Sequence, residues 1–228
     1  MSELVANLEK LRKQKKVNLA RSAYEQIKEA IVYAKFKPGE CLSENMLAEV
    51  LEMSRTPVRE ALKELTNEDL VEIVPGRGVI VKDISRKNLK EIFELRKVLE
   101  CLAAETAIAN LTEAEILNLE NDWLTIMTKI NQGEKVAWEH VSRCDNKLHS
   151  TIINNCDNSY LKDFMKILNQ QILRYQLLTA QALDDVKDTV RQHLEIIKLL
   201  KERDPGALIP VLREHIELAE RIILKGRF

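Results

Sequence analysis

The chain has 228 residues, enough for one large or two modest domains with a sizeable core. Hydrophobic residues make up 45% but aromatic residues only 4%, with 6 Gly and 5 Pro, which predicts a mainly α protein built on Leu, Ile, Ala and Val. The net charge is −1, and residues 1–86 hold 15 Lys and Arg against 14 Asp and Glu. Bulk charge therefore gives no attraction to nucleic acid, and any such binding would need a local cationic face.

The cysteines and the apolar runs bear on the compartment. Cys41, Cys101, Cys144 and Cys156 show no CxxC or other ligand-like spacing, which favours free thiols in a reducing environment. No apolar run approaches the ~18 residues that a membrane span needs, and no signal-peptide pattern is present. We therefore expect a soluble, cytoplasmic protein.

The first segment of the chain is basic and the second is helical. Residues 1–18 contain closely spaced cations at Lys10, Arg12, Lys13, Lys15 and Lys16. They predict either an N-terminal arm that contacts DNA phosphates or a solvated tail. Apolar residues at helical spacing then predict a helix from Ser22 to about Phe36.

The segment from Leu42 to Val81 has the pattern of a winged helix-turn-helix. A short helix, a tight turn and a second helix capped by Ser54 precede two apolar runs, Val71–Val74 and Val79–Val81. The connection Pro75-Gly76-Arg77-Gly78 predicts a β-hairpin wing. With the preceding helix, this gives three helices plus a wing over residues 1–86, and we expect their small core to be closed by Leu70, Val71, Ile73 and Ile80.

The second helix of this motif has one cationic and one apolar face. Its apolar stripe is Val58, Leu62 and Leu65, and on the opposite face Arg55, Arg59 and Lys63 lie four residues apart. Ser54 would accept a backbone N–H of the first turn, and the glycines beside Arg77 would let the hairpin tip adopt positive φ. This agreement favours contacts with DNA phosphates or base edges over the alternative, a solvated charged face.

These residues also resemble a known family. The stretch SRTPVREAL, preceded by PGECLSENMLAEVLEM and followed by LTNEDLVEIVPGRGVIV, is similar to the winged-helix domain of the GntR transcriptional regulators. The resemblance implies base and phosphate contacts from Arg55, Thr56 and Arg59, with Gly76 and the wing entering the minor groove. The family usually has an arginine where this chain has Asn45, so that contact is missing or altered here.

A short linker separates the wing from a long helical region. The periodicity changes at residues 83–86 from strand-like to helical, which places the domain boundary near residue 86. Residues 87–228 are expected to form an antiparallel all-α bundle, because only short connections separate the predicted helices. These helices are expected at about 87–109, 112–131, 134–154, 159–181, 186–202 and 205–225.

Four polar side chains fall on apolar stripes of the predicted bundle. Asp145 and His149 lie one turn apart on the stripe of their helix, and His193 and His215 each occupy a stripe position of a later helix. Each histidine alone is more simply explained as a hydrogen-bonded core residue. Together, one carboxylate and three imidazoles form a set suited to Zn²⁺, Ni²⁺, Mn²⁺ or Fe²⁺, with coordination positions left for water or a carboxylate.

Two arginines are candidates for binding an anion inside the bundle. Arg96 lies on the apolar stripe of its helix with Leu99, where its guanidinium needs either an acidic ligand or an internal partner such as Glu100. Arg174 is a second candidate, although its helix has apolar residues on more than one face.

The helical region resembles a family as well. ELRKVLE, DNKLH, QH and REH are similar to the FCD effector domain of FadR-type GntR regulators, whose metal-binding members have ligands at the positions of Asp145, His149, His193 and His215. The resemblance implies that Arg96 meets the carboxylate of a small organic acid. It further implies a ligand-responsive transcriptional regulator that binds a palindromic operator as a homodimer.

Three alternatives remain open at this point. The metal itself could be the signal, or the bundle could only dimerise a constitutive DNA-binding protein. A metal with open positions could also activate water in a hydrolase. We expect no enzyme, because no further acid or base accompanies the ligands in sequence and the winged helix would have no role.

Overall fold

The computed structural model describes residues 18–83, 85–178 and 186–225. The chain divides into two compact units, Met1–Asp83 and Ile84–Phe228. Each unit has its own hydrophobic core and each is described by itself below. The predicted N-terminal arm lies almost entirely outside the described residues.

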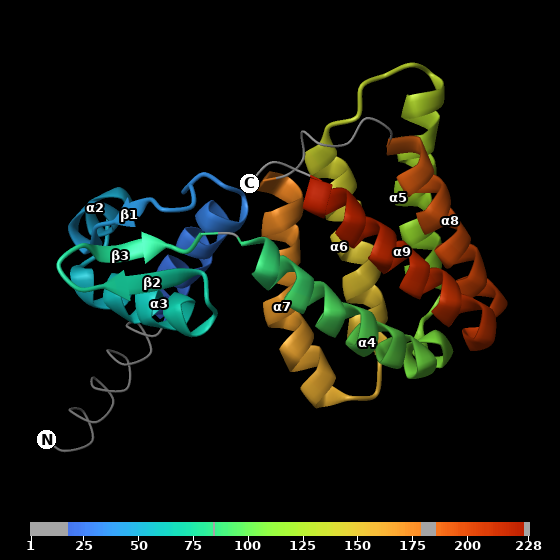
Figure 1. Cartoon of the computed structure of the whole chain (residues 1–228), viewed down its shortest axis with the longest axis horizontal. Coiled ribbons are helices and arrows are strands. Elements are labelled where there is room, and N and C mark those ends of the chain that lie inside the picture. Colours follow the sequence, from blue (N-terminus) through green and yellow to red (C-terminus); the bar gives the residue numbers. More distant parts are fainter. Residues whose placement is uncertain (1–17, 84, 179–185, 226–228) are drawn as a thin grey trace, which may run out of the picture. The chain divides into compact units, whose positions relative to one another are not determined.

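The N-terminal unit is a winged helix-turn-helix, as the sequence predicts (Figure 1). After a helix over residues 18–32, its elements are β1 (Cys41–Leu42), α2 (Glu44–Val50), α3 (Arg55–Asn67), β2 (Val71–Val74) and β3 (Gly78–Val81). The antiparallel sheet has the strand order β1-β3-β2. β1 was not predicted, because a strand of two residues is too short to show an alternating pattern.

Three details of this unit differ from the prediction. The first helix ends at residue 32 rather than at Phe36, because Ala34 adopts φ 55° and the Phe36 N–H bonds back to the Ala30 carbonyl, which closes the helix. Ser54 occupies the N-cap position of α3, but its side chain makes no capping hydrogen bond. Ile73 is 61% exposed and not part of the core, although strand alternation places it on the same face as the buried Val71.

The core of the N-terminal unit explains the orientation of α3. The buried face of α3 packs with residues of the first helix, α2 and the strands, and this core includes Ile27, Ile31, Leu47, Val58, Leu62, Leu65, Leu70, Val71 and Val81. At the wing, Gly76 and Gly78 adopt φ 77° and 87°, as predicted for the tip of the hairpin. The apolar stripe of α3 is therefore buried and its cationic face is exposed.

The C-terminal unit is an all-α bundle, which confirms the predicted fold class (Figure 1). α4 packs against α6, α7 and α9, and α8 packs against α5 and α9. None of the helices that the structure describes is both long and apolar enough to cross a membrane. The helices are α4 (Arg86–Asn110), α5 (Glu113–Asn131), α6 (Trp138–Asn155), α7 (Ser159–Leu178), α8 (Val186–Glu202) and α9 (Pro205–Lys225).

The helix ends that the structure describes lie within one residue of the predicted ones, except at the start of α6, and the end predicted at residue 181 lies outside the described residues. A capping box formed by Thr112 and Glu115 begins α5. α6 begins at Trp138 instead of residue 134, because Gly133 adopts φ 76° after α5 and the chain is not helical again before Trp138. This later start leaves Asp145 and His149 well inside α6.

Candidate metal centre and DNA-reading surface

Four side chains from three helices converge in the bundle. Asp145, His149, His193 and His215 are buried, and one ligand atom from each lies within 4.8 Å of the others. The His193 Nε2 lies 2.8 Å from Asp145 Oδ1, and the Nε2 atoms of His149 and His215 are 3.3 Å apart. The fourth histidine, His140, is exposed and lies outside this cluster.

Each of the three histidines has an oxygen acceptor at its other ring nitrogen. The Nδ1–H of His193 donates to the Thr189 carbonyl over 2.7 Å, and that of His215 donates to Gln192 Oε1 over 3.0 Å. The Nδ1–H of His149 donates to the Glu100 carboxylate. These bonds favour the tautomers whose Nε2 lone pairs face the common point, as metal ligation requires.

Charge in the cluster is balanced by an ion pair on α4. Arg96 Nε lies 3.1 Å from Glu100 Oε2, and Arg96 Nη2 lies 4.0 Å from Asp145 Oδ2. Burial raises the pKa of Glu100, but the charges of His149 and Arg96 outweigh burial and lower that pKa. Burial likewise raises the pKa of Asp145, and the charge of His149 outweighs it, so that this pKa lies well below its usual value.

The histidines differ in their protonation. Burial lowers the pKa of His215 to about 3, with a further contribution from His193, so this ring is neutral near pH 7. Burial also lowers the pKa of His149, but the Glu100 carboxylate outweighs it and the net shift is upward. A neutral imidazole and an ionised carboxylate are the forms that bind a divalent metal, so metal binding would displace a proton from His149 whenever that ring is charged. With that proton displaced, the donor set fits Zn²⁺, Ni²⁺, Mn²⁺ or Fe²⁺.

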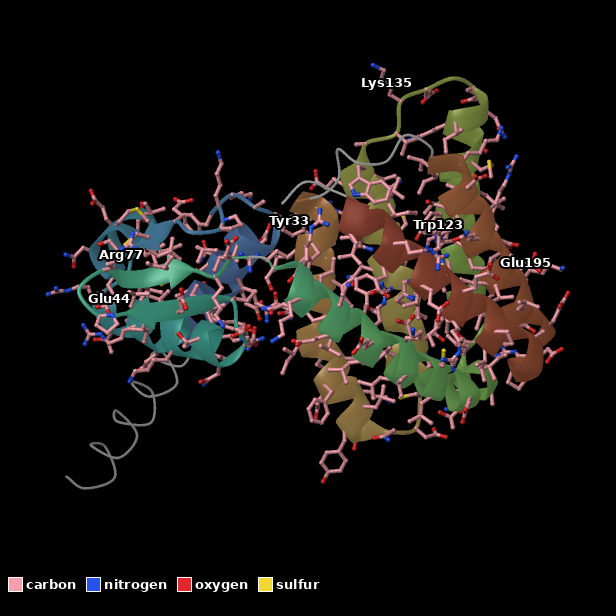
Figure 2. All side chains as sticks on the ribbon, viewed as in Figure 1. Tyr33, Glu44, Arg77, Trp123, Lys135 and Glu195 are labelled. Carbon is pink, nitrogen blue, oxygen red and sulfur yellow. The ribbon has the colours of Figure 1, made fainter. Side chains whose placement is uncertain are left out.

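Two further side chains hold the ligands in place. The indole of Trp123 on α5 stacks on the ring of His193, with centroids 3.8 Å apart and an interplanar angle of 13°. Figure 2 labels Trp123 between α5 and α8, where this stacking occurs. Gln176 Nε2 on α7 donates to Asp145 Oδ2 over 2.8 Å. With these contacts, α4, α5 and α7 add supporting residues to the ligands of α6, α8 and α9.

A cavity of about 40 Å³ adjoins two of the four ligands. Its polar end is formed by Asp145, His215, Gln176, Thr189 and Gln192. The rest of the lining is apolar and consists of Trp138, Leu218, Ala219, Ile222 and Ile223. A small molecule bound here would therefore have one end at the cluster and the other against hydrocarbon and indole.

The two candidate arginines are buried but do not line this cavity. Arg96 pairs with Glu100, which is the internal partner considered from the sequence, and its Nη1 has no hydrogen-bond partner among the described residues. Arg174 is 1% exposed. The contact of Glu100 with His149 was not predicted, because it joins two helices. Trp123, Gln176 and Gln192 were not predicted as supporting residues either, because no spacing rule connects them to the histidines.

The predicted DNA-reading residues lie exposed on α3 and the wing. Arg59 is held by α2, since its Nε and Nη2 bond to the Glu44 carboxylate oxygens at 2.9 and 2.7 Å. Arg55 Nη1 donates to Asn45 Oδ1 over 3.3 Å. Figure 2 labels Glu44 on α2 and Arg77 on the wing. Thr56, Lys63, Gly76 and Arg77 are exposed as well.

Comparison with known proteins identifies both units. Residues 19–81 match the family of bacterial regulatory proteins, gntR family, and residues 91–218 match the FCD domain. The chain is 28% identical to the HTH-type transcriptional regulator YdhC of Bacillus subtilis, covering 81% of each chain. It is 26% identical to the HTH-type transcriptional repressor RspR of Escherichia coli, covering 87% of this chain and 86% of the relative.

A solved structure shares the fold of the whole chain. It is that of E. coli McbR/YncC, which has a TM-score of 0.78 at 22% identity and covers 91% of this chain and 97% of its own. A winged helix-turn-helix that matches the gntR family precedes a helical bundle that matches the FCD domain over more than half of the chain. The chain therefore belongs to the GntR family of transcriptional regulators and carries an FCD domain.

Proposed function

We propose that this regulator binds a divalent transition metal through Asp145, His149, His193 and His215, and that a small organic acid at the metal modulates its affinity for a palindromic operator. The observation that supports the proposal is the convergence of four buried donor atoms within 4.8 Å. Burying the Asp145 carboxylate is costly, and a metal ion would add a positive charge to the partners that it already has in Gln176 and His193. When bound, the metal supplies an electrophilic centre with positions open to a carboxylate.

The supporting residues prepare this centre for the metal. Glu100, Thr189 and Gln192 accept the Nδ1–H groups, which leaves the Nε2 atoms to bind the metal in exchange for any proton that they carry. Arg96 holds Glu100 and lies near Asp145 Oδ2, where it offsets part of the negative charge. Arg96 and Arg174 remain our candidates for contact with the acid, although neither lines the cavity.

The DNA-reading surface is assigned to Arg55, Thr56, Arg59, Lys63, Gly76 and Arg77. The exposed arginines of α3 suit base edges and phosphates in the major groove, and the wing with Arg77 suits the minor groove or the backbone. Relatives in Escherichia coli and Bacillus subtilis are named repressors. We infer that this chain also represses transcription, and that it acts in the cytoplasm, where its DNA would lie.

We assign the dimer interface to exposed apolar residues of α4 and α7. Leu95, Val98 and Leu102 lie on one side of α4 and are 53%, 59% and 46% exposed. α7, which packs against α4, exposes Tyr160, Phe164 and Ile167. Such rows of large apolar side chains mark an interaction surface, and a second copy of the chain is the partner that a two-fold operator requires.

Operator binding under three conditions tests the proposal. The full chain would first select an operator from a randomised DNA duplex library. Its affinity would then be measured after chelation, with Zn²⁺ or Mn²⁺ alone, and with metal plus a panel of organic acids. We expect the acid to change the affinity only when the metal is present. A response to metal alone would identify a metal sensor, and no response to either would leave a constitutive DNA-binding protein.

A further inference from the structure

The lining of the cavity beside the metal centre restricts the class of acid that fits. Of its ten lining residues, the only carboxylate is Asp145, one of the four ligands, and within the described chain no Lys or Arg lines it. The Arg96 guanidinium forms an ion pair with Glu100 and does not line the cavity. A ligand carboxylate at the metal end would be satisfied, whereas a second carboxylate at the far end would be buried without a cation.

The far wall also disfavours hydroxyl groups. Trp138 presents its ring to the cavity while its Nε1–H donates to the Gln176 carbonyl over 3.0 Å, so that donor is already used. Leu218, Ala219 and Ile222 offer only hydrocarbon side chains. A polyhydroxylated chain placed against this wall would lose hydrogen bonds to water without replacing them. The wall therefore suits methyl and methylene groups.

The size of the cavity sets the length of the acid. Its volume is about 40 Å³. One water needs roughly 10–15 Å³ of such space, so the cavity accommodates on the order of three non-hydrogen atoms beyond the atoms at the metal. Gln192 Oε1 accepts from His215, and its amide N–H₂ makes no hydrogen bond within the described residues, which leaves a donor for one oxygen near the carboxylate.

We propose that the effector is a short monocarboxylate with an apolar tail, such as a four-carbon acid with or without a 2-hydroxyl group. This inference rests on the proposed function, because its carboxylate lies at the metal end formed by Asp145 and His215. The tail packs against Trp138, Leu218 and Ile222. Dicarboxylates and sugar acids are disfavoured, because the described residues of the apolar wall offer no cation and no free hydrogen-bonding side chain.

Butyrate and succinate provide a matched pair of probes, since they have four carbons each and differ by one carboxylate. Binding would be measured on the full chain loaded with one equivalent of Zn²⁺, and separately of Mn²⁺, by calorimetry and by tryptophan fluorescence. The further ligands are 2-hydroxybutyrate and gluconate. We expect butyrate or 2-hydroxybutyrate to bind at least about tenfold more tightly than succinate or gluconate. Succinate or gluconate binding as tightly would overturn this inference and leave the proposed function intact.

The absence of binding by every acid to metal-loaded protein would refute both the inference and the organic-acid part of the proposed function. Variants at the apolar wall give an independent result. Ile222→Arg, at a half-buried position, should weaken butyrate binding about tenfold and strengthen succinate binding, because it places a cation at the far end. Ile209→Arg is the matched control, half-buried on the same helix but not part of the lining.

Ile222→Ala serves as a milder variant if the arginine disturbs folding. It lengthens the cavity without adding charge, so the preferred monocarboxylate should become longer by one or two carbons, as a comparison of butyrate with hexanoate would measure. An unchanged preference between these two acids in Ile222→Ala, with metal bound, would show that the tail does not lie against this wall.

Discussion

The Glu44 carboxylate accepts hydrogen bonds from Arg59 at both oxygens, from Nε to Oε1 over 2.9 Å and from Nη2 to Oε2 over 2.7 Å. This pair links α2 to the exposed face of α3. The hydrogen bond from Arg59 is the largest cause that lowers the pKa of Glu44, and the positive charge of Arg59 adds to it. An arginine whose guanidinium is held by both oxygens of a carboxylate adopts few side-chain conformations. Glu44 is thus placed to position the arginine that we assign to base reading.

Replacing Glu44 with Gln tests this positioning role. The change removes the carboxylate, so Arg59 loses its fixed geometry while the unit gains positive charge. We expect the preference for the selected operator over random DNA to fall by about tenfold, in the range of one bidentate base contact, while binding to random DNA stays the same or rises. Both affinities would be measured by fluorescence anisotropy at several salt concentrations.

Glu49→Gln is the matched control for Glu44, since it makes the same charge change at an exposed position of α2. It should leave the ratio of operator to random-DNA affinity unchanged. Equal ratios in the two variants would argue against a positioning role. A larger rise for the operator in Glu44→Gln would instead show that Glu44 competes with DNA for Arg59.

Removal of the metal or of His193 should destabilise the helical unit. A metal that binds only the folded chain adds about 2.7 kcal/mol when its free concentration is a hundred times Kd. We expect chelation to lower the melting temperature, and His193→Ala to bind less metal and lose the response to chelation. Calorimetric melting and elemental analysis would measure both effects. The control is His140→Ala, at an exposed position on α6, which should bind metal and melt as the unmodified chain does. Full metal occupancy in His193→Ala would show that His193 is not a ligand.

Glu100 should tune metal affinity without touching the metal. Its carboxylate accepts the Nδ1–H of His149 and pairs with Arg96. Replacing an acceptor of this kind typically lowers metal affinity by about 10- to 100-fold, so Glu100→Gln should raise the Kd by that factor in competition with a chromogenic chelator. Glu105→Gln, exposed on the same helix, is the control. Identical Kd values in the two variants would contradict a role for Glu100 in orienting His149.

The proposed dimer surface can be tested by introducing an aspartate at one of two leucines that are almost equally exposed, one on the surface and one outside it. Leu95 on α4 is 53% exposed and Leu117 on α5 is 52% exposed, so an aspartate at either position has a similar effect on solvation. Leu95→Asp should convert the dimer to a monomer in light-scattering measurements, because it buries a charge between the two copies. Leu117→Asp should remain dimeric. A dimer that persists in Leu95→Asp would move the interface to another face.

Thiol labelling should distinguish the four cysteines. Cys41 is exposed, while Cys101, Cys144 and Cys156 are buried. Burial raises the pKa of the Cys101 thiol and raises that of Cys144 to about 11, so little thiolate forms at Cys144 near pH 8. A thiol reagent should label one residue per native chain, identified as Cys41 by mass spectrometry, and the other three only in denaturant. Rapid labelling of Cys144 in native protein would contradict its burial.

Local periodicity was enough to predict the pieces of this protein. The four-residue spacing of Arg55 and Arg59 fixes them on one side of a helix, and the glycines at the wing fix a tight hairpin, because both properties depend on backbone geometry within a few residues. For the same reason Asp145 and His149 share one face of α6. The winged fold and the all-α bundle followed from these local patterns.

Tertiary packing decided what surrounds those pieces. Successive residues on a helix differ by about 100° in direction, so the spacing near Arg96 does not decide how deeply Leu99 or Glu100 is buried. In the packed bundle Leu99 is partly buried, whereas Glu100 is fully buried and contacts His149 on α6. The stacking of Trp123 on His193 and the separation of Arg96 and Arg174 from the cavity likewise depend on how whole helices rotate and pack. Sequence spacing constrains positions within one helix, whereas the partners of a side chain across helices are set by the packing of the entire core.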